Sequence, residues 1–143
     1  MHARPKRSAC ATVALGCLLA GCTGGSASHS AASAPCPRVA PAEDTSALPR
    51  ALDLESLATV TEVVRQDGFV NATAVTDGTL SGVQDRFSRV LRRAGYEIVG
   101  AENEVVEADI FFARGQATTG GVKLVQTACD GRVRVRLFIG KTP

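Results

Sequence analysis

The chain has 143 residues, of which 45% are hydrophobic, 21% charged and 4% aromatic. A chain of this length holds one domain, which excludes a large multidomain enzyme and a solute-binding protein built from two lobes. Three of the 16 basic residues and none of the 14 acidic residues precede Cys22, so the formal charge of +2 comes from the N-terminus. From Cys22 onward the net charge is −1, which gives no electrostatic argument for binding nucleic acid.

The first 21 residues have the pattern of a secretory signal peptide. Arg4, Lys6 and Arg7 precede a mainly apolar run over residues 9–20. Basic residues ahead of a short apolar segment keep that end in the cytoplasm while the segment enters the translocon. The run has about a dozen residues, whereas a helix needs about 20 to span a bilayer. We therefore predict a signal peptide at residues 1–21 rather than a membrane-spanning anchor.

A four-residue motif ends this signal. Leu19-Ala20-Gly21-Cys22 resembles the lipobox of bacterial lipoproteins. The resemblance implies cleavage before Cys22, two fatty-acid chains on its sulfur, and a new amine that is open to a third. Two or three chains anchor a protein stably, because each buried methylene contributes about 0.8 kcal/mol. We expect a lipid-anchored protein on the outer face of the cell membrane; cleavage near Ala20 or beyond, which releases a soluble protein, is the alternative.

Residues 22–50 are predicted to form an acylated flexible tether. Small and polar residues dominate this stretch, and four of the six prolines lie in residues 31–50. Such a composition buries too little apolar surface to offset the entropy lost when the backbone is ordered. The remaining residues, 51–143, are expected to form a single α+β domain.

Two β-rich segments flank a turn at the start of this domain. Residues 59–66 and 69–76 are separated by Asp67-Gly68, which suits a two-residue hairpin because both residues tolerate positive φ. Strict alternation divides the apolar residues into two sets, Val60, Val64, Phe69 and Val75 against Val63, Val70, Ala72 and Ala74. The pattern does not decide which set a helix covers.

One amphipathic helix follows this hairpin. Apolar residues recur with helical spacing over residues 80–94, and basic residues occupy the other side. Ser81-Gly82-Val83-Gln84 fits a capping box at its start, and Gly95 suits a left-handed end. This helix is the clearest element that the sequence predicts.

Further strands are predicted at residues 96–102, 107–114, 122–128 and 132–140. The last two flank Asp130-Gly131, and a two-residue loop there pairs Cys129 with Arg132. This register gathers one apolar face: Val122, Leu124, Val133, Val135, Leu137 and Ile139. The predicted architecture is ββαββββ, an antiparallel sheet of five or six strands with one helix packed on one face.

Of the five cysteines, Cys10 and Cys17 lie in the predicted signal peptide and Cys22 carries the predicted lipid. Cys36 and Cys129 remain, which is an even pair in an exported protein. We predict a disulfide between them, with free thiols or pairing between chains as the alternatives. The bridge would draw the end of the tether over the face of the sheet that carries Cys129.

The predicted domain lacks the side chains that several catalytic mechanisms require. Both histidines, His2 and His29, precede it, and it has no tryptophan and no thiol beyond the predicted pair. A Ser–His or Cys–His nucleophile and a zinc site of His and Cys are therefore excluded from it. No phosphate loop, Gly-x-Gly-x-x-Gly or Gly-x-Ser-x-Gly motif occurs. We expect a protein that is not an enzyme and that holds no cofactor or metal.

Four acidic residues gather at a predicted strand connection: Glu102, Glu104, Glu107 and Asp109. Paired carboxylates perform acid–base work in glycosidases or ligate calcium. Their spacing matches no calcium loop, and acidic residues at a strand connection are commonly solvated. We interpret the cluster as a solvated surface; a hydrolase that uses it is our third functional hypothesis.

A basic row lies on the last predicted strand. Arg132, Arg134 and Arg136 share a face with Phe138, and Lys123 joins them from the neighbouring strand. A solvated face whose basic residues pair with acidic neighbours is the more ordinary interpretation. The alternative is a face that docks a partner, because arginine beside aromatic residues on an uncovered face is typical of such sites.

Three features in order resemble small lipoproteins of unknown function from high-GC Gram-positive bacteria. They span residues 58–139: the Asp-Gly hairpin, the helix ending in Leu91-Arg92-Arg93-Ala94-Gly95-Tyr96, and the hairpin at Cys129-Asp130-Gly131. The resemblance implies a non-enzymatic envelope module and transfers no functional residue beyond Cys22.

The first functional hypothesis is a binding or scaffolding lipoprotein, whose uncovered sheet face contacts an envelope protein or an anionic surface polymer. The second is a carrier of lipid or another apolar ligand held between the helix and the sheet. An open cavity there favours the carrier, whereas a filled core with exposed apolar residues favours docking.

Overall fold

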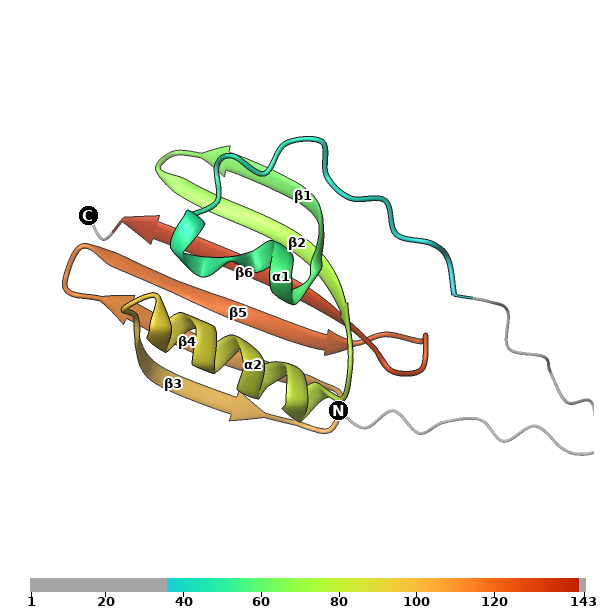
Figure 1. Cartoon of the computed structure of the whole chain (residues 1–143). Coiled ribbons are helices and arrows are strands. Elements are labelled where there is room, and N and C mark those ends of the chain that lie inside the picture. Colours follow the sequence, from blue (N-terminus) through green and yellow to red (C-terminus); the bar gives the residue numbers. More distant parts are fainter. Residues whose placement is uncertain (1–35, 142–143) are drawn as a thin grey trace, which may run out of the picture. The chain divides into compact units, whose positions relative to one another are not determined.

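The computed structural model describes residues 36–141, which form one antiparallel sheet with helices on one face (Figure 1). The six strands are ordered β1-β2-β6-β5-β4-β3. Their bounds are β1 Thr59–Gln66, β2 Phe69–Asp77, β3 Glu97–Asn103, β4 Glu107–Arg114, β5 Thr118–Gln126 and β6 Arg132–Lys141. The predicted signal peptide, Cys22 and the first part of the predicted tether lie outside the described residues.

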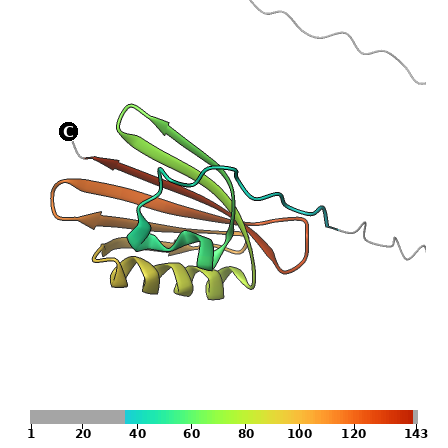
Figure 2. The same cartoon turned by 45° about the horizontal axis from the view of Figure 1, so that its top comes forward.

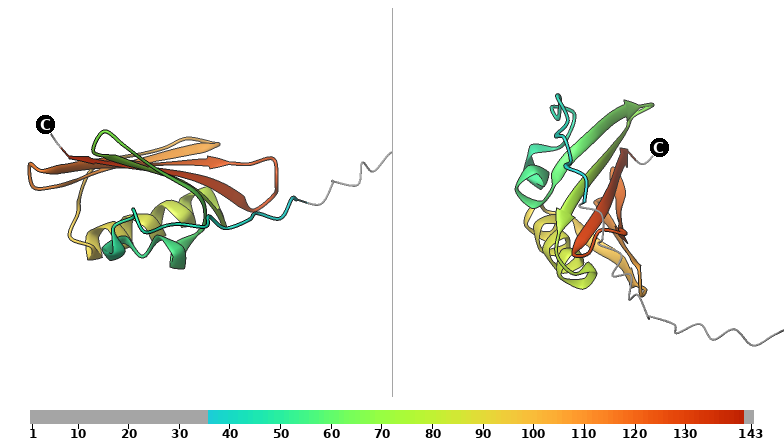
Figure 3. Two further views of the ribbon diagram at one scale, coloured as in Figure 1. Left: turned by 90° about the horizontal axis from the view of Figure 1, so that it is seen from above. Right: turned by 90° about the vertical axis from the view of Figure 1, so that its right-hand side faces the viewer.

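Three helical elements lie on the same side of the sheet, as the edge-on view shows (Figure 3). They are the 3-10 turn η1 (Arg50–Leu52) and the α-helices α1 (Leu54–Leu57) and α2 (Leu80–Arg93). Figure 2 shows α1 beside α2 along that face. The predicted α+β class with an antiparallel sheet is confirmed. The prediction of a single covering helix was incomplete, because η1 and α1 are too short to show a helical period.

Helix α2 begins with a different cap from the predicted one. Thr79 is the capping residue, and its hydroxyl oxygen accepts a hydrogen bond from the backbone N–H of Gly82 at 3.2 Å. Ser81 already lies inside the helix, so the predicted capping box is wrong. At the other end Gly95 has a φ of 84°, and the N–H of Tyr96 donates to the carbonyl oxygen of Leu91 at 3.0 Å. This closure confirms the predicted left-handed end.

The core lies between the helices and the sheet. Helix α2 buries Leu80, Val83, Phe87 and Leu91. Opposite them, the predicted apolar face of the last two strands is buried, with each side chain at most 7% exposed: Val122, Leu124, Val133, Val135, Leu137 and Ile139. Burying side chains of this size stabilises the fold by about 1.5–3 kcal/mol each.

The first hairpin forms as predicted, and a bulge decides which face is buried. Asp67 and Gly68 have φ values of 50° and 82°, as a two-residue turn requires. The register of β1 shifts between Val60 and Glu62, which places Val60 on the same face as Val63. That face carries Ala72 and Ala74 and is the covered one, whereas Val64 and Phe69 stay exposed. Strict alternation assigned Val60 to the wrong set because it did not foresee the bulge.

The predicted register of the last hairpin is wrong by two residues, although the faces are correct. Gln126 pairs with Val133, and the loop between the strands has five residues, 127–131, rather than two. Within this loop only Gly131 has a positive φ, whereas the predicted turn needs one at both central residues. Because the shift is even, the side chains that remain in the two strands keep their predicted faces, whereas Cys129 lies in the loop.

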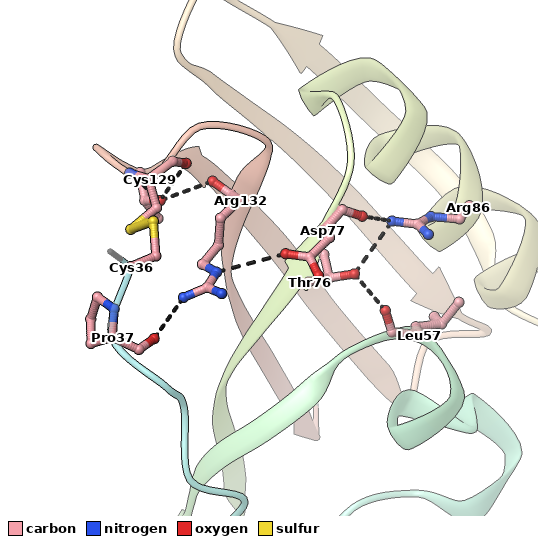
Figure 4. A network of polar contacts seen from close by, with 9 residues as sticks. Cys36, Pro37, Leu57, Thr76, Asp77, Arg86, Cys129 and Arg132 are labelled. Atoms are coloured by element: carbon pink, nitrogen blue, oxygen red, sulfur yellow. Dashed lines mark hydrogen bonds and ion pairs between the residues drawn. A yellow bond between two sulfur atoms is a disulfide. The ribbon is translucent and has the colours of Figure 1, made fainter. Parts of the chain in front are cut away.

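The predicted disulfide is present, and it joins the N-terminal end of the described chain to the loop before β6. Cys36 is bonded to Cys129, with Cα atoms 5.7 Å apart. The Arg132 guanidinium donates to the carbonyl oxygen of Pro37 at 2.8 Å and lies 3.6 Å from the Asp77 carboxylate (Figure 4). The bridge and Arg132 therefore hold residues 36 and 37 against the start of β6.

Residues 38–50 continue along the sheet edge. The N–H of Ala42 donates to the carbonyl oxygen of Val60 at 2.7 Å, and Ala42 and Leu48 pack against the buried core. The folded unit therefore includes residues 36–50, which precede the predicted start of the domain at residue 51.

Removal of the disulfide tests its contribution to stability. The variant Cys36→Ser/Cys129→Ser is expected to lose about 3–4 kcal/mol of unfolding free energy, because a link across 93 residues no longer restricts the unfolded chain. Urea unfolding followed by circular dichroism measures this loss. A reductant should lower wild-type stability to that of the variant and leave the variant unchanged. Equal stability of variant and oxidised wild type would contradict the prediction.

Two adjacent glycines of β5 provide a matched test of packing on the two faces. A Cβ on Gly120 would lie 2.5 Å from the carbonyl oxygen of Phe138 and overlap the buried ring of Phe112. Gly120→Ala should therefore lower the free energy of unfolding by about 2–3 kcal/mol. A Cβ on Gly121 meets only the Phe138 ring on the uncovered face, which has room to move. Gly121→Ala should cost under about 1 kcal/mol in urea unfolding, and equal losses would refute this account.

Candidate functional site

The face of the sheet turned away from the helices is uncovered in the described part of the chain (Figure 3). We refer to it as the open face. Paired residues of antiparallel neighbours point to the same side, so the side chains of this face form rows that cross the strands. Strands β6 and β5 are central in these rows, and β1 and β3 are the edges.

The predicted partner residues lie together on the open face. Arg132, Arg134, Arg136 and Phe138 alternate along β6 with buried residues that face the helices. Lys123 of β5 is paired in register with Arg136. Arg134 and Arg136 are exposed, and Phe138 retains 43% of its accessible surface.

Two of the four basic residues are engaged within the chain. The Lys123 ammonium lies 3.0 Å from the Glu107 carboxylate and 3.4 Å from that of Asp109. The hydrogen bond with Glu107, reinforced by Asp109, raises the pKa of Lys123 above its usual value. Arg132 is held by Asp77 and the Pro37 carbonyl.

Arg134 and Arg136 differ from these two residues, because neither forms an ion pair with another residue in the range 36–141. Their guanidinium groups are therefore the positive charges of the open face that are available to a partner. Both arginines project from β6, which is paired with β2 on one side and with β5 on the other.

The four acidic residues also meet on the open face. Glu102 is paired with Asp109 across β3 and β4, and the N–H of Glu104 donates to the carbonyl oxygen of Glu107 at 2.7 Å. Within residues 36–141 no group of three or more His, Cys, Asp or Glu is arranged to hold a metal ion. Sequence reasoning found both clusters but did not place them on one surface, because that requires the strand order β6-β5-β4-β3.

Three phenylalanine rings of the open face lie across glycines of the neighbouring strand. The register pairs are Phe138 with Gly121, Phe69 with Gly140, and Phe111 with Gly100. A Cβ on Gly121 or Gly140 would overlap the opposite ring, so these two rings lie flat over backbone. All three remain 40–45% exposed. Sequence reasoning named Phe138 but missed Phe69; a glycine opposite an aromatic residue in register is the signal that identifies such positions.

The space under the helices leaves no room for a ligand, although a hollow of about 540 Å³ opens at one end of the covered face, between residues 46–49 and the side chains of Val70, Tyr96 and Ile139. Between η1, α1, α2 and the sheet the remaining void is about 10 Å³, lined by apolar residues including Leu54, Phe87 and Leu137. Sites for small molecules usually measure about 300–1,000 Å³. A hollow of about 530 Å³ does occur beside residues 38–39 and the start of β1, but its lining includes Arg38, Glu55 and Asp77 and it lies outside the core.

No helix within residues 36–141 combines the length and the apolar character that crossing a bilayer requires. Comparisons with known protein families and with curated protein sequences find no match for this chain. The resemblance to small bacterial lipoproteins therefore stays a prediction.

Proposed function

We propose that the protein is an exported, lipid-anchored binding module that docks a partner on its open face and catalyses no reaction. The observation that carries the proposal is the difference between the two faces of the sheet. One face is buried under the helices, whereas the other exposes Arg134 and Arg136 beside the rings of Phe138 and Phe111. Arginine and aromatic side chains supply much of the binding energy at protein interfaces.

The open face is also organised in advance for binding. Arg134, Arg136 and Phe138 project from β6, which is hydrogen-bonded to β2 on one side and β5 on the other. The Phe138 ring lies over the backbone of Gly121. Side chains that are already restricted lose less conformational entropy when a partner binds.

The other interpretations have less support. The filled space between α2 and the sheet argues against a carrier that holds an apolar ligand between them. A hydrolase has little support, since Lys123 already engages Glu107 and Asp109 on an exposed surface. A merely solvated basic row accounts for Lys123 and Arg132, which have acidic partners, but not for Arg134 and Arg136.

The proposed location depends on the N-terminal motif together with the disulfide. A bridge such as Cys36–Cys129 persists in oxidising compartments outside the cytoplasm, which supports export. Cys22 lies outside the described residues, so its acylation is supported only by the resemblance of Leu19-Ala20-Gly21-Cys22 to a lipobox.

Mass spectrometry of the mature N-terminus tests the anchor. The wild-type chain is expected to begin at Cys22 and to carry the mass of two or three fatty-acid chains. Cys22→Ser should abolish that added mass, whereas the control Cys17→Ser, inside the predicted signal, should leave it unchanged. A mature chain that begins elsewhere, or an unmodified Cys22, would contradict the proposed anchor.

Photocrosslinking in intact cells tests the docking face. A photoreactive residue in place of Phe138 should give a covalent adduct with a macromolecule, whereas the same residue in place of Arg89, exposed on α2, should not. Arg134→Ser/Arg136→Ser should reduce the Phe138 adduct at least about tenfold, since arginines at such sites contribute more than 1 kcal/mol each. The control Arg89→Ser/Arg92→Ser removes the same charge from α2 and should leave the adduct intact. No adduct from position 138 would refute the proposed function.

A further inference from the structure

We infer that the partner of the open face is a second copy of this chain. The inference depends on the proposed function and names the occupant of the same surface. Its basis is the way in which the charges of the open face are divided across the strands. The basic half lies on β6 and β5, and the acidic half lies on β4, on β3 and at the residue that follows β3: Arg132, Arg134, Arg136 and Lys123 against Glu107, Asp109, Glu102 and Glu104.

A surface divided in this way is complementary to itself. When an identical face is turned over and laid on it, the basic half of each copy meets the acidic half of the other. Closed twofold symmetry is also the commonest arrangement of protein oligomers, and it requires such a self-complementary patch. With a net charge of −1 from Cys22 onward, two copies carry almost no overall repulsion.

The charge pattern selects the direction of the twofold axis. If the axis crossed the strands, β6 would lie over β6 and β3 over β3, so that like charges would face each other. If the axis runs along the strands between β5 and β4, β6 lies over β3 of the partner subunit and β5 over its β4. Only this second direction joins opposite charges across the four strands β6, β5, β4 and β3.

Individual rows of the sheet fit this arrangement. Arg136, Lys123, Asp109 and Glu102 form one row across the four strands. Turned about the axis, this row sets Arg136 against Glu102 of the partner subunit. The adjacent row ends in Glu104, which then meets Arg134 in the same way. The two arginines that lack an ion pair in the described chain are therefore the ones that gain one.

The aromatic row of the open face matches as well. Phe138 leans over Gly121, between β6 and β5, and Phe111 is paired with Gly100, between β4 and β3. Rotation about the proposed axis lays Phe138 on Phe111 of the partner subunit. Two ring pairs form by symmetry, and rings that are 43% and 40% exposed become covered.

The size of the contact predicts a weak dimer that a membrane strengthens. Four strands about 4.8 Å apart, each about eight residues long at about 3.3 Å per residue, cover roughly 500 Å² of the open face in each copy. This contact area is at the low end for specific protein interfaces. An axis along the strands keeps the Cys36–Cys129 ends of both copies at the same end of the dimer. Two chains anchored in one membrane need this arrangement, and confinement there raises their effective concentration.

A charge exchange tests the inference on the full chain, isolated in detergent in the form that its host produces. Arg134→Glu/Arg136→Glu sets two acidic residues against Glu104 and Glu102 of the partner subunit, and Glu102→Arg/Glu104→Arg sets two basic residues against Arg136 and Arg134 of the partner subunit. Sedimentation velocity at low salt should show dimers for the wild type and at least about tenfold weaker association for each variant alone. An equimolar mixture of the two variants should form dimers again. The control Arg89→Glu/Arg92→Glu reverses the same charges on α2 and should dimerise like the wild type.

The outcomes separate this inference from the proposed function. Restored dimers in the mixture, with a Phe138 adduct that contains two copies of the chain, support both. A wild type that stays monomeric, or a mixture that fails to associate, overturns the inference. If the Phe138 adduct then contains a different macromolecule, the proposed function stands without it. If position 138 gives no adduct at all, the proposed function fails as well.

Discussion

The pairing of β2 with β6 holds the two parts of this fold together. Nine residue pairs, from Phe69 with Gly140 to Asp77 with Arg132, join the first hairpin to the last strand of the chain. Without this pairing the hairpin would be an isolated two-stranded ribbon, which is marginally stable in water. The same pairing moves β6 from an edge to the middle of the sheet, and with it the arginine row to the middle of the open face.

Local signals in the sequence predicted the elements well, and non-local contacts explain what they missed. Asp67-Gly68 and the apolar face of α2 act over a few residues, so their positions were correct. The contact of Arg132 with Pro37 spans 95 residues, and the pairing of Ala42 with Val60 depends on a sheet edge that must already exist. Composition alone therefore did not predict that residues 36–50 pack against the domain.

The candidate site shows why some errors are harmless and others are not. The last hairpin was predicted two residues out of register, yet Arg132, Arg134 and Arg136 kept their face because side chains alternate with a period of two. Their ion-pair partners could not be predicted in the same way. Lys123 stands beside Arg136, a repulsive pair by itself, and Glu107 and Asp109 from β4 offset that repulsion.

The bridge between Cys36 and Cys129 has a mechanical consequence. A pull on the N-terminal side of Cys36 passes through the two sulfur atoms into the loop before β6. The force therefore does not pass through residues 37–58. The central strands of the sheet carry the load instead. A domain attached to a surface at that end can therefore bear a pulling force without separation of its edge strand β1 from the sheet.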